Sequence, residues 1–352
     1  MWSSAVRHNA VTGWDVGGAH LKVAALDGHG RVEQVHVLPC PLWLGLHHLE
    51  AATDQALALL GGGTRRHAMT LTGELADIFR DRPEGVRTLV QFMAARLAGR
   101  ELLVYAGSAG FFTPEAVAEH PELVASANWL AAATFAAARL ACGLLVDIGS
   151  TTTDITLVSA GRVHNRGYTD HERLHYEEIV YTGAVRTPVA AIVQRVPFAG
   201  EWLPLMAEQF ATTADVHRLT GALPEHADLL PACDNGPKTV EGSARRLARM
   251  IGLDADTAPL AAWRRLACHV SEVQLRRVQV ACERALSRGI VDEAVPVVGA
   301  GVGRFLVEQL AARLRCAYID FGSLLDARPA ERARAADCAP AVAVAELART
   351  WA

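Results

Sequence analysis

The chain has 352 residues, which at roughly 150 residues per domain predicts two domains or one large divided domain. Hydrophobic residues make up 51% and charged residues 20%, a composition that supports a buried core and excludes a disordered chain. The 34 basic and 38 acidic residues give a formal net charge of −4, so we expect neither a nucleic-acid partner nor binding to an anionic membrane.

The N-terminus, the apolar segments and the cysteines predict a cytoplasmic protein. The first ten residues lack an apolar core of signal-peptide length. The most apolar segment, 129–146, is interrupted by Thr134 and Arg139 and indicates a buried helix rather than a membrane span. Seven scattered cysteines without a CxxC pair exclude a disulfide framework and a zinc site. Of the 34 basic residues only Lys22 and Lys238 are lysines. Each either has a role that an arginine cannot fill or was retained by chance.

A glycine-containing hairpin occurs twice. Alternating apolar residues around a glycine turn predict a β-hairpin over Gly13–Val32, and a similar segment recurs at Val146–Val163. At an offset of 132 residues, Asp and Gly match between the two copies. The matching pairs are Asp15 with Asp147 and Gly17 with Gly149. The repeat predicts two similar lobes that meet at a cleft, the first over residues 1–141 and the second over 142–352.

The remaining apolar spacing predicts strands alternating with helices. Helices are expected at 46–60, 86–97, 128–140, 171–178 and 305–314, and strands at 32–37, 68–71, 102–105, 143–146, 295–298 and 317–321. Residues 239–288 are predicted to be mostly helical with interruptions at Gly242 and Gly252, and one Arg- and Ala-rich helix to close the chain. This order predicts an α/β fold.

The turns of both hairpins have the composition of a phosphate-binding loop. Glycine allows a close approach to an anion, successive N–H groups form an anion nest, and an Asp at the strand end orients a hydrated divalent cation. We therefore predict Mg²⁺ at Asp15 and Asp147. The predicted phosphate contacts are Gly17, Gly18 and His20 in the first loop and Gly149, Ser150, Thr151 and Thr152 in the second. A purely structural glycine turn is the alternative.

A third glycine cluster, Gly299–Gly303, lies between a predicted strand and a predicted helix. Gly299 and Gly301 suit a nucleotide-like group or a phosphate at a helix N-terminus. The GxGxG spacing is a poor dinucleotide fingerprint, and the absence of GxxxxGK[ST] argues against a P-loop nucleotidase.

These three loops resemble the two phosphate loops and the adenosine loop of the actin, sugar-kinase and heat-shock chaperone superfamily. The strings Thr70-Leu-Thr-Gly-Glu-Leu-Ala-Asp77, Ala127-Asn-Trp129 and Tyr181-Thr-Gly-Ala-Val-Arg-Thr-Pro188 resemble its hydantoinase A/oxoprolinase-like branch. The chain is also similar to an archaeal and methylotroph family linked to tetrahydromethanopterin-dependent one-carbon metabolism. The resemblance covers most of residues 11–325 and implies a two-lobed ribonuclease-H-like fold with a central cleft.

The resemblance also implies a reaction. Archaeal members of that family are methanofuran biosynthesis enzymes, which join an aminomethylfuran-methyl diphosphate to the phenol of γ-glutamyltyramine and release diphosphate. The expected partners are therefore a furfuryl-type diphosphate and a tyramine-type phenol, with Mg²⁺ as cofactor. A furfuryl diphosphate ionises easily, so the protein mainly neutralises the departing diphosphate and positions the phenol.

Several side chains are candidates for this chemistry, each with a structural alternative. Asp154 is a catalytic candidate or a turn cap, and Lys22 either reaches a phosphate or is an exposed strand lysine. Glu74 and Asp77 share one face if their segment is helical, and one of them is a candidate base for the phenol proton, or a carboxylate at a helix start.

Two further candidates are implied mainly by the family strings. Arg186 is predicted to clamp phosphate or carboxylate, with a buried ion pair as the alternative, and Asn128 belongs to the site through the resemblance, with a helix cap as the alternative. His164, His171 and His175 match no metal-ligand spacing, and Lys238 is expected on a turn.

The sequence leaves two other functions open. An ATP-dependent kinase or hydantoinase/oxoprolinase-like ATPase would use ATP at Gly299–Gly303, although His20 stands where superfamily kinases often have a small hydroxyl residue. A nucleotide-dependent scaffold is the third possibility, disfavoured because no substrate-binding β-domain follows residue 325. The oligomeric state is not predicted.

Overall fold

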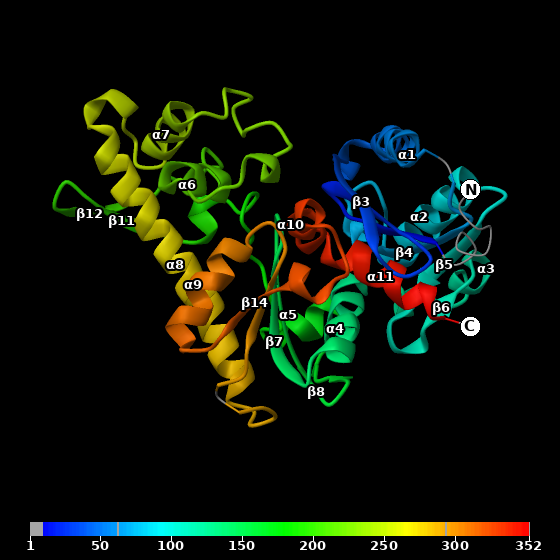
Figure 1. Ribbon diagram of the computed structural model, residues 1–352. Coiled ribbons are helices and arrows are strands. Elements are labelled where there is room, and N and C mark those ends of the chain that lie inside the picture. The colour runs from blue at the N-terminus through cyan, green and yellow to red at the C-terminus, as the bar shows by residue number, and fades with distance from the viewer. Residues whose placement is uncertain (1–9, 62, 293, 352) are drawn as a thin grey trace. The chain divides into compact units, whose positions relative to one another are not determined.

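The computed structural model describes residues 10–61, 63–292 and 294–351 (Figure 1). The chain forms two compact units: unit 1 consists of Met1–Gly143, Val158–Glu172 and Asp320–Ala352, and unit 2 of Leu144–Leu157 and Arg173–Ile319. The first division lies near the predicted boundary at residue 142. Residues 1–9, most of the segment tested for a signal peptide, lie outside the described residues. No helix in the described ranges has the length and hydropathy that crossing a membrane requires.

Within its described residues, unit 1 contains a six-stranded sheet in the order β3-β2-β1-β4-β5-β6. The strands are β1 (Val11–Val16), β2 (His20–Leu26), β3 (Val32–Pro39), β4 (Arg66–Leu71), β5 (Glu101–Tyr105) and β6 (Phe111–Phe112). Strands β1 and β2 form the predicted hairpin, and β4 and β5 run parallel to β1. The parallel strands therefore end at one edge of the sheet, immediately before the Gly17 and Glu74 segments.

Helices cover the sheet of unit 1. They are α1 (Leu46–Leu60), α2 (Arg82–Arg96), α3 (Pro114–Val117), α4 (Asn128–Arg139), α10 (Pro329–Asp337) and α11 (Ala339–Arg349). Trp14, Leu49 and Leu89 belong to one core, which joins β1 to α1 and α2. The red α11 lies against the strands of this sheet in Figure 1, and a Cβ at Gly13 of β1 would overlap the Ala341 carbonyl. A glycine is therefore required where α11 approaches the strand.

Unit 2 contains most of a second sheet. The strand order of this sheet is β10-β8-β7-β13-β14, and β9 pairs with β8. The strands are β7 (Cys142–Ile148), β8 (Thr153–Ser159), β9 (Arg162–Val163), β10 (Ile179–Val180), β13 (Val297–Ala300) and β14 (Tyr318–Asp320), and a separate hairpin pairs β11 (Arg195–Phe198) with β12 (Glu201–Pro204). The helices are α6 (Thr213–Thr220), α7 (Val240–Arg249), α8 (Leu260–Leu286) and α9 (Arg304–Leu314). α5 (Asp170–His175) contains the division between the units.

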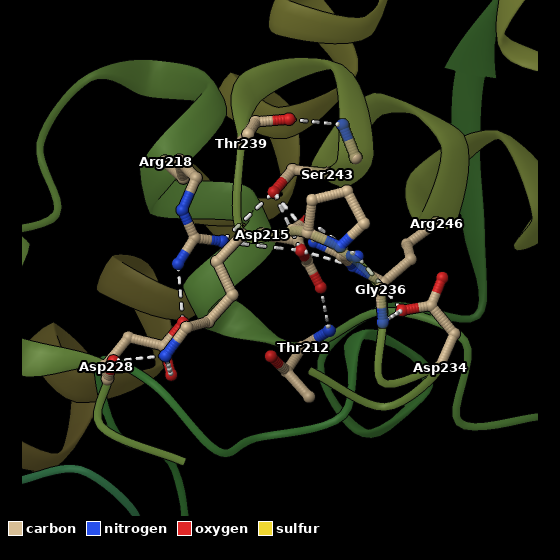
Figure 2. A network of polar contacts seen from close by, with 12 residues as sticks. Thr212, Asp215, Arg218, Asp228, Asp234, Gly236, Thr239, Ser243 and Arg246 are labelled. Carbon is tan, nitrogen blue, oxygen red and sulfur yellow. Dashed lines mark hydrogen bonds and ion pairs between the residues drawn. The ribbon is translucent and has the colours of Figure 1, made fainter. Parts of the chain in front are cut away.

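A polar network holds the segment between α6 and α7 in place (Figure 2). Buried Arg246 donates from Nε to Asp215 Oδ1 over 2.8 Å, and Arg218 pairs with Asp228. Lys238 Nζ donates to the carbonyls of Asp228 and Leu230 over 2.7 and 3.1 Å. Lys238 is therefore a structural contact of this segment, and it lies beyond the turn at residues 232–235 rather than on it.

Three sequence expectations differ from the structure. Gly242 lies inside α7, where a Cβ would overlap the Pro237 carbonyl, and the actual break is at Gly252 with φ 72°. The closing helix is two helices, which meet at Cys338 with Pro340 in the first turn of α11. Residues 320–352 belong to unit 1 rather than to a lobe over 142–352, because α11 is apolar nearly all round and is buried against β1 and α4.

Candidate functional site

The candidate site of unit 1 begins with Asp15 near the end of β1. In the sheet register Asp15 lies opposite Lys22 of β2 on one side and Thr70 of β4 on the other. Lys22 Nζ is 3.4 Å from Asp15 Oδ2, and the two side chains are 21% and 3% exposed. Both sequence candidates therefore lie on one sheet face, together with Thr70, which the sequence analysis did not assign to the site.

The carboxylate of Asp15 lies in an environment that retains unused hydrogen-bonding capacity. Burial raises its pKa, and hydrogen bonding from Lys22 and from Asn128 at the start of α4 opposes that rise. Asp15 Oδ1 and Thr70 Oγ1 are buried and accept no hydrogen bond of ordinary geometry from the described residues. Buried polar atoms are normally hydrogen-bonded, so these two oxygens could bind a polar ligand at this face of the sheet.

The turn between β1 and β2 brings backbone close to this face. Gly17 N donates to His20 O over 3.1 Å and closes the turn, and His20 is buried. A Cβ at Gly17 would lie 2.9 Å from His20 O, whereas a Cβ at Gly18 would meet no heavy atom within 4 Å. The packing of the protein therefore does not require a glycine at position 18, and the space beside it is open.

A buried carboxyl adjoins this loop. Thr72 N donates to Val16 O over 3.0 Å, and a short 3₁₀ turn over Gly73–Leu75 follows. Glu74 is 1% exposed, and its Oε1 is hydrogen-bonded to Ser126 Oγ at 2.7 Å. Asp77 is exposed and lies beyond the 3₁₀ turn, so no common helical face carries the two carboxylates.

A cavity of about 550 Å³ in unit 1 lies beyond the end of β5. Its aromatic lining residues are Tyr105, Phe111, Tyr168 and Trp351, and Leu130 and Thr134 of α4 form part of the wall. A cavity of this size, with mixed apolar and hydroxyl lining, is suited to a small aromatic molecule. The sequence analysis did not find it, because its lining comes from four separate segments.

The second hairpin, β7–β8 in unit 2, repeats the backbone of the first. Gly149 N donates to Thr152 O over 2.9 Å, as Gly17 does to His20. Ser150 Oγ is buried without a hydrogen-bond partner among the described residues. Arg186 Nη1 donates to Thr151 Oγ1 over 3.3 Å, and burial lowers the pKa of this guanidinium, which remains charged at neutral pH. Arg186 therefore lies at the second glycine loop.

The glycine cluster Gly299–Gly303 packs directly on the end of β7. Gly301 has φ 78°, and a Cβ there would overlap Asp147 Oδ1 and the Ile148 carbonyl. Gly303 N donates to Ile148 O over 2.8 Å. The expected order of strand, glycine turn and helix is confirmed by β13 and α9, and these glycines have a structural reason independent of a nucleotide.

Asp154 of β8 forms an ion pair within unit 2. Arg173 Nη1 donates to Asp154 Oδ1 over 2.8 Å, with the guanidinium 1% exposed, and Arg173 Nη2 donates to Glu178 O over 2.9 Å. This carboxylate anchors α5 to the sheet, a role that the sequence analysis did not consider.

The donor set limits how Mg²⁺ would bind. No group of three or more His, Cys, Asp or Glu side chains that could hold a metal occurs in the described part of the chain. The open Oδ1 of Asp15 fits a hydrated Mg²⁺ that also binds ligand phosphates, because Mg²⁺ commonly uses one or two carboxylates plus water. Asp147, beside Gly301, is the equivalent candidate in unit 2.

The fold and the comparisons together define the class of protein. Two sheets, each with an Asp-x-Gly hairpin, give an α/β protein of the ribonuclease-H-like, actin and sugar-kinase type. A nucleotide-free acetone carboxylase, described as acting in ATP-dependent acetone carboxylation, has the same fold with a TM-score of 0.53 and 11% identity, covering 85% of this chain and 67% of that one. The hydantoinase/oxoprolinase family model matches residues 65–348, and the chain belongs to this family.

Two curated relatives carry the same enzyme name. The (4-{4-[2-(gamma-L-glutamylamino)ethyl]phenoxymethyl}furan-2-yl)methanamine synthase of Methanocaldococcus jannaschii is 29% identical over 248 residues, 70% of this chain and 72% of the relative. The synthase of that name from Methanococcus vannielii is 31% identical over 111 residues, 32% of this chain and 50% of the relative.

Proposed function

We propose that this chain is a transferase in the biosynthesis of a methanofuran-type cofactor. It joins an aminomethylfuran-methyl diphosphate to the phenol of a tyramine-type acceptor, γ-glutamyltyramine or an analogue, and releases diphosphate. The names of the relatives support the product, since each contains a furan joined to a phenoxymethyl group. The observation that carries the proposal here is the Asp15–Lys22–Thr70 face, with its unused buried oxygens beside a glycine turn.

The proposed chemistry asks for charge neutralisation. When the furfuryl carbon–oxygen bond breaks, its electron pair stays on diphosphate, and the phenol oxygen forms the new bond to carbon as it loses its proton. Lys22 would hold the departing anion, and the open space at Gly18 would let the backbone of the turn approach it closely. A hydrated Mg²⁺ held by Asp15 would supply further positive charge to the phosphate oxygens.

We place the acceptor phenol in the cavity beyond β5. Tyr105 and Phe111 form an edge-to-face pair with ring centroids 5.4 Å apart, and Phe111 and Trp351 form another at 5.6 Å. A tyramine ring would extend this aromatic group, which favours such edge-to-face contacts.

An ATP-dependent kinase or ATPase is the second candidate. The glycine cluster between β13 and α9 favours it, because it presents a strand, a glycine turn and a helix N-terminus in the order that suits a phosphate. This function predicts tight ATP binding and turnover, and requires no furan substrate.

Calorimetric and thermal-shift titrations distinguish the two functions. Purified protein is titrated with Mg²⁺ plus diphosphate and, separately, with Mg²⁺ plus ATP, since a ligand specific for the native state raises Tm. The transferase predicts binding of diphosphate, weakened in Gly18→Ala, whose added methyl meets ligand but no protein atom within 4 Å. ATP binding with hydrolysis, and no ether from the synthetic furan diphosphate, would favour the second candidate and contradict the first.

A further inference from the structure

A serine hydroxyl in unit 1 lies between two carboxylates. Ser126 Oγ is 2.7 Å from Glu74 Oε1 and 3.0 Å from Asp170 Oδ2. Arg82 Nη2 donates to the same Asp170 oxygen over 2.6 Å. Ser126 is itself buried and has φ 51°, an unfavourable conformation for a residue with a side chain, so the surrounding fold holds this hydroxyl in place.

The number of hydrogens fixes the protonation of this group. A serine hydroxyl has one hydrogen to donate, yet its oxygen is within hydrogen-bond distance of two carboxyl groups. Each contact has a hydrogen of its own when one carboxyl is protonated and donates to the serine oxygen. Asp170 is paired with Arg82, whereas Glu74 Oε2 has no hydrogen-bond partner among the described residues. The additional proton therefore belongs on Glu74.

The exposed fractions of these side chains show which end of the hydrogen-bonded group faces solvent. Glu74 is 1% exposed, the Asp170 side chain 16% and the Arg82 side chain 34%, so the hydrogen-bonded path runs from the interior to the surface. Desolvation raises the pKa of Glu74, and Asp170 raises it further, while the hydrogen bond from Ser126 and the charge of Arg82 oppose the rise. This direction agrees with a neutral Glu74.

We propose that Glu74 is protonated in the resting protein and that Ser126 and Asp170 relay its proton to and from solvent. Glu74 reaches the site through its own segment, since a Cβ at Gly73 would lie 3.2 Å from Val16 O and 3.3 Å from the Gly17 carbonyl carbon. The other end of the Ser126–Asn128 segment interacts with Asp15. The segments that carry Glu74 and Ser126 therefore both adjoin the predicted diphosphate loop.

The relay gives Glu74 a role in the proposed transfer, and this role rests on the proposed function. As the carbon–oxygen bond breaks with its electron pair on diphosphate, the Glu74 proton moves to a diphosphate oxygen. The phenol proton leaves to solvent, and the Glu74 carboxylate is reprotonated from solvent through Asp170 and Ser126. Glu74 is thus an acid rather than the base expected from the sequence, because a protonated carboxyl cannot accept the phenol proton.

Infrared difference spectroscopy tests the protonation without requiring activity. At neutral pH the wild type is expected to show the carbonyl stretch of a protonated carboxylic acid that disappears in Glu74→Gln. The band persists in the matched control Glu119→Gln, which removes an exposed carboxylate of the same unit. Absence of a band that Glu74→Gln removes would overturn the proposal, whether or not the protein proves to be the proposed transferase.

Exchange of the same proton tests the relay. In D₂O the band shifts as the acid proton exchanges, and we expect the shift to be about tenfold slower in Ser126→Gly and in Asp170→Asn, a factor equal to about 1.4 kcal/mol of barrier. Glycine accepts the positive φ, so Ser126→Gly removes the hydroxyl without adding strain. Exchange at the wild-type rate in both folded variants would show that the proton reaches solvent by another route and would contradict the relay.

Discussion

The two glycine hairpins share a backbone but differ in charge at an equivalent position. In both, a glycine N–H closes the turn on the residue three positions later, over 3.1 Å at Gly17 and 2.9 Å at Gly149. Seven residues after the aspartate, the first hairpin has Lys22 and the second has Asp154. Asp15 of the first hairpin therefore has its cation, Lys22, on the neighbouring strand. In the second hairpin the position of Lys22 is taken by Asp154, which pairs with Arg173 of α5.

This difference shows what the duplication preserved. The strand–turn–strand geometry, which needs glycine and hydrogen bonds, is the same in both units. The electrostatics are not, since unit 2 brings its loop cation, Arg186, from a different segment. A repeated motif therefore predicts backbone more reliably than it predicts the role of each side chain.

The largest expected effect is on activity. Asp15→Asn removes the carboxylate that we place on Mg²⁺ while retaining its shape, and we expect kcat to fall at least about 1,000-fold, the scale of losing a strong electrostatic contact to the transition state. Asp147→Asn should also lower activity. Steady-state rates of ether formation measure both. Asp326→Asn, which removes a surface carboxylate 69% exposed, is the control and should retain the wild-type rate.

The next effect is on stability rather than catalysis. Arg173→Met removes a buried guanidinium and leaves the partly buried Asp154 without its cation, and we expect the free energy of unfolding to fall by about 3 kcal/mol. Arg284→Met removes a surface partner of Glu177 and should change it by less than about 1 kcal/mol. Urea unfolding provides the comparison. Equal, small losses in both variants would show that the Asp154–Arg173 pair does not support the second hairpin.

A smaller loss of stability is expected from the glycine cluster. Gly301→Ala places a methyl group against Asp147 Oδ1 at a positive φ, and we expect a loss of about 2 kcal/mol. Gly18→Ala meets no neighbour within 4 Å and should lie within about 0.5 kcal/mol of wild type. Thermal unfolding without ligand measures both. A Gly301→Ala protein as stable as wild type would contradict the close packing of this turn on β7.

The smallest effect concerns acid stability, and it is shared by the two units. Burial lowers the pKa of His67 in unit 1 and of His217 in unit 2 to about 4. The unfolded chain then binds more protons below about pH 6.5, so stability falls as pH decreases from about 6.5 towards 4, by about 1 kcal/mol for each histidine at about pH 5.5. Urea unfolding at about pH 6.5 and about pH 5.5 measures the loss of unfolding free energy on acidification. This loss should be smaller in His67→Gln and in His217→Gln, and unchanged in the exposed control His29→Gln.

Much of the fold could be predicted because its signals are local. The glycine hairpin, the helix at 46–60 and the Ala-rich helix after Asn128 follow from apolar spacing and turn residues, and the structure confirms them. The short hairpin β11–β12 and α6 were missed, because four-residue strands and an eight-residue helix carry little periodicity.

The candidate site was predictable only in part. Asp15, Lys22 and Glu74 were found from a motif, an alternation and a family string. Ser126 and Asp170 were missed because their contacts are distant in sequence, 52 residues from Ser126 to Glu74 and 44 to Asp170. No local pattern marks such contacts, because Glu74 follows β4, Ser126 lies just before α4 and Asp170 begins α5.

The most direct test of the phosphate role of the first hairpin is the affinity for diphosphate with Mg²⁺, measured calorimetrically in two lysine variants. Lys22→Met removes the cation beside Asp15, and Lys238→Met removes the chain's other lysine, which holds carbonyls of the α6–α7 segment. We predict that Kd rises at least about tenfold, or about 1.4 kcal/mol, in Lys22→Met and stays unchanged in Lys238→Met. An unchanged Kd in a folded Lys22→Met protein would contradict the assignment of this hairpin as the diphosphate site.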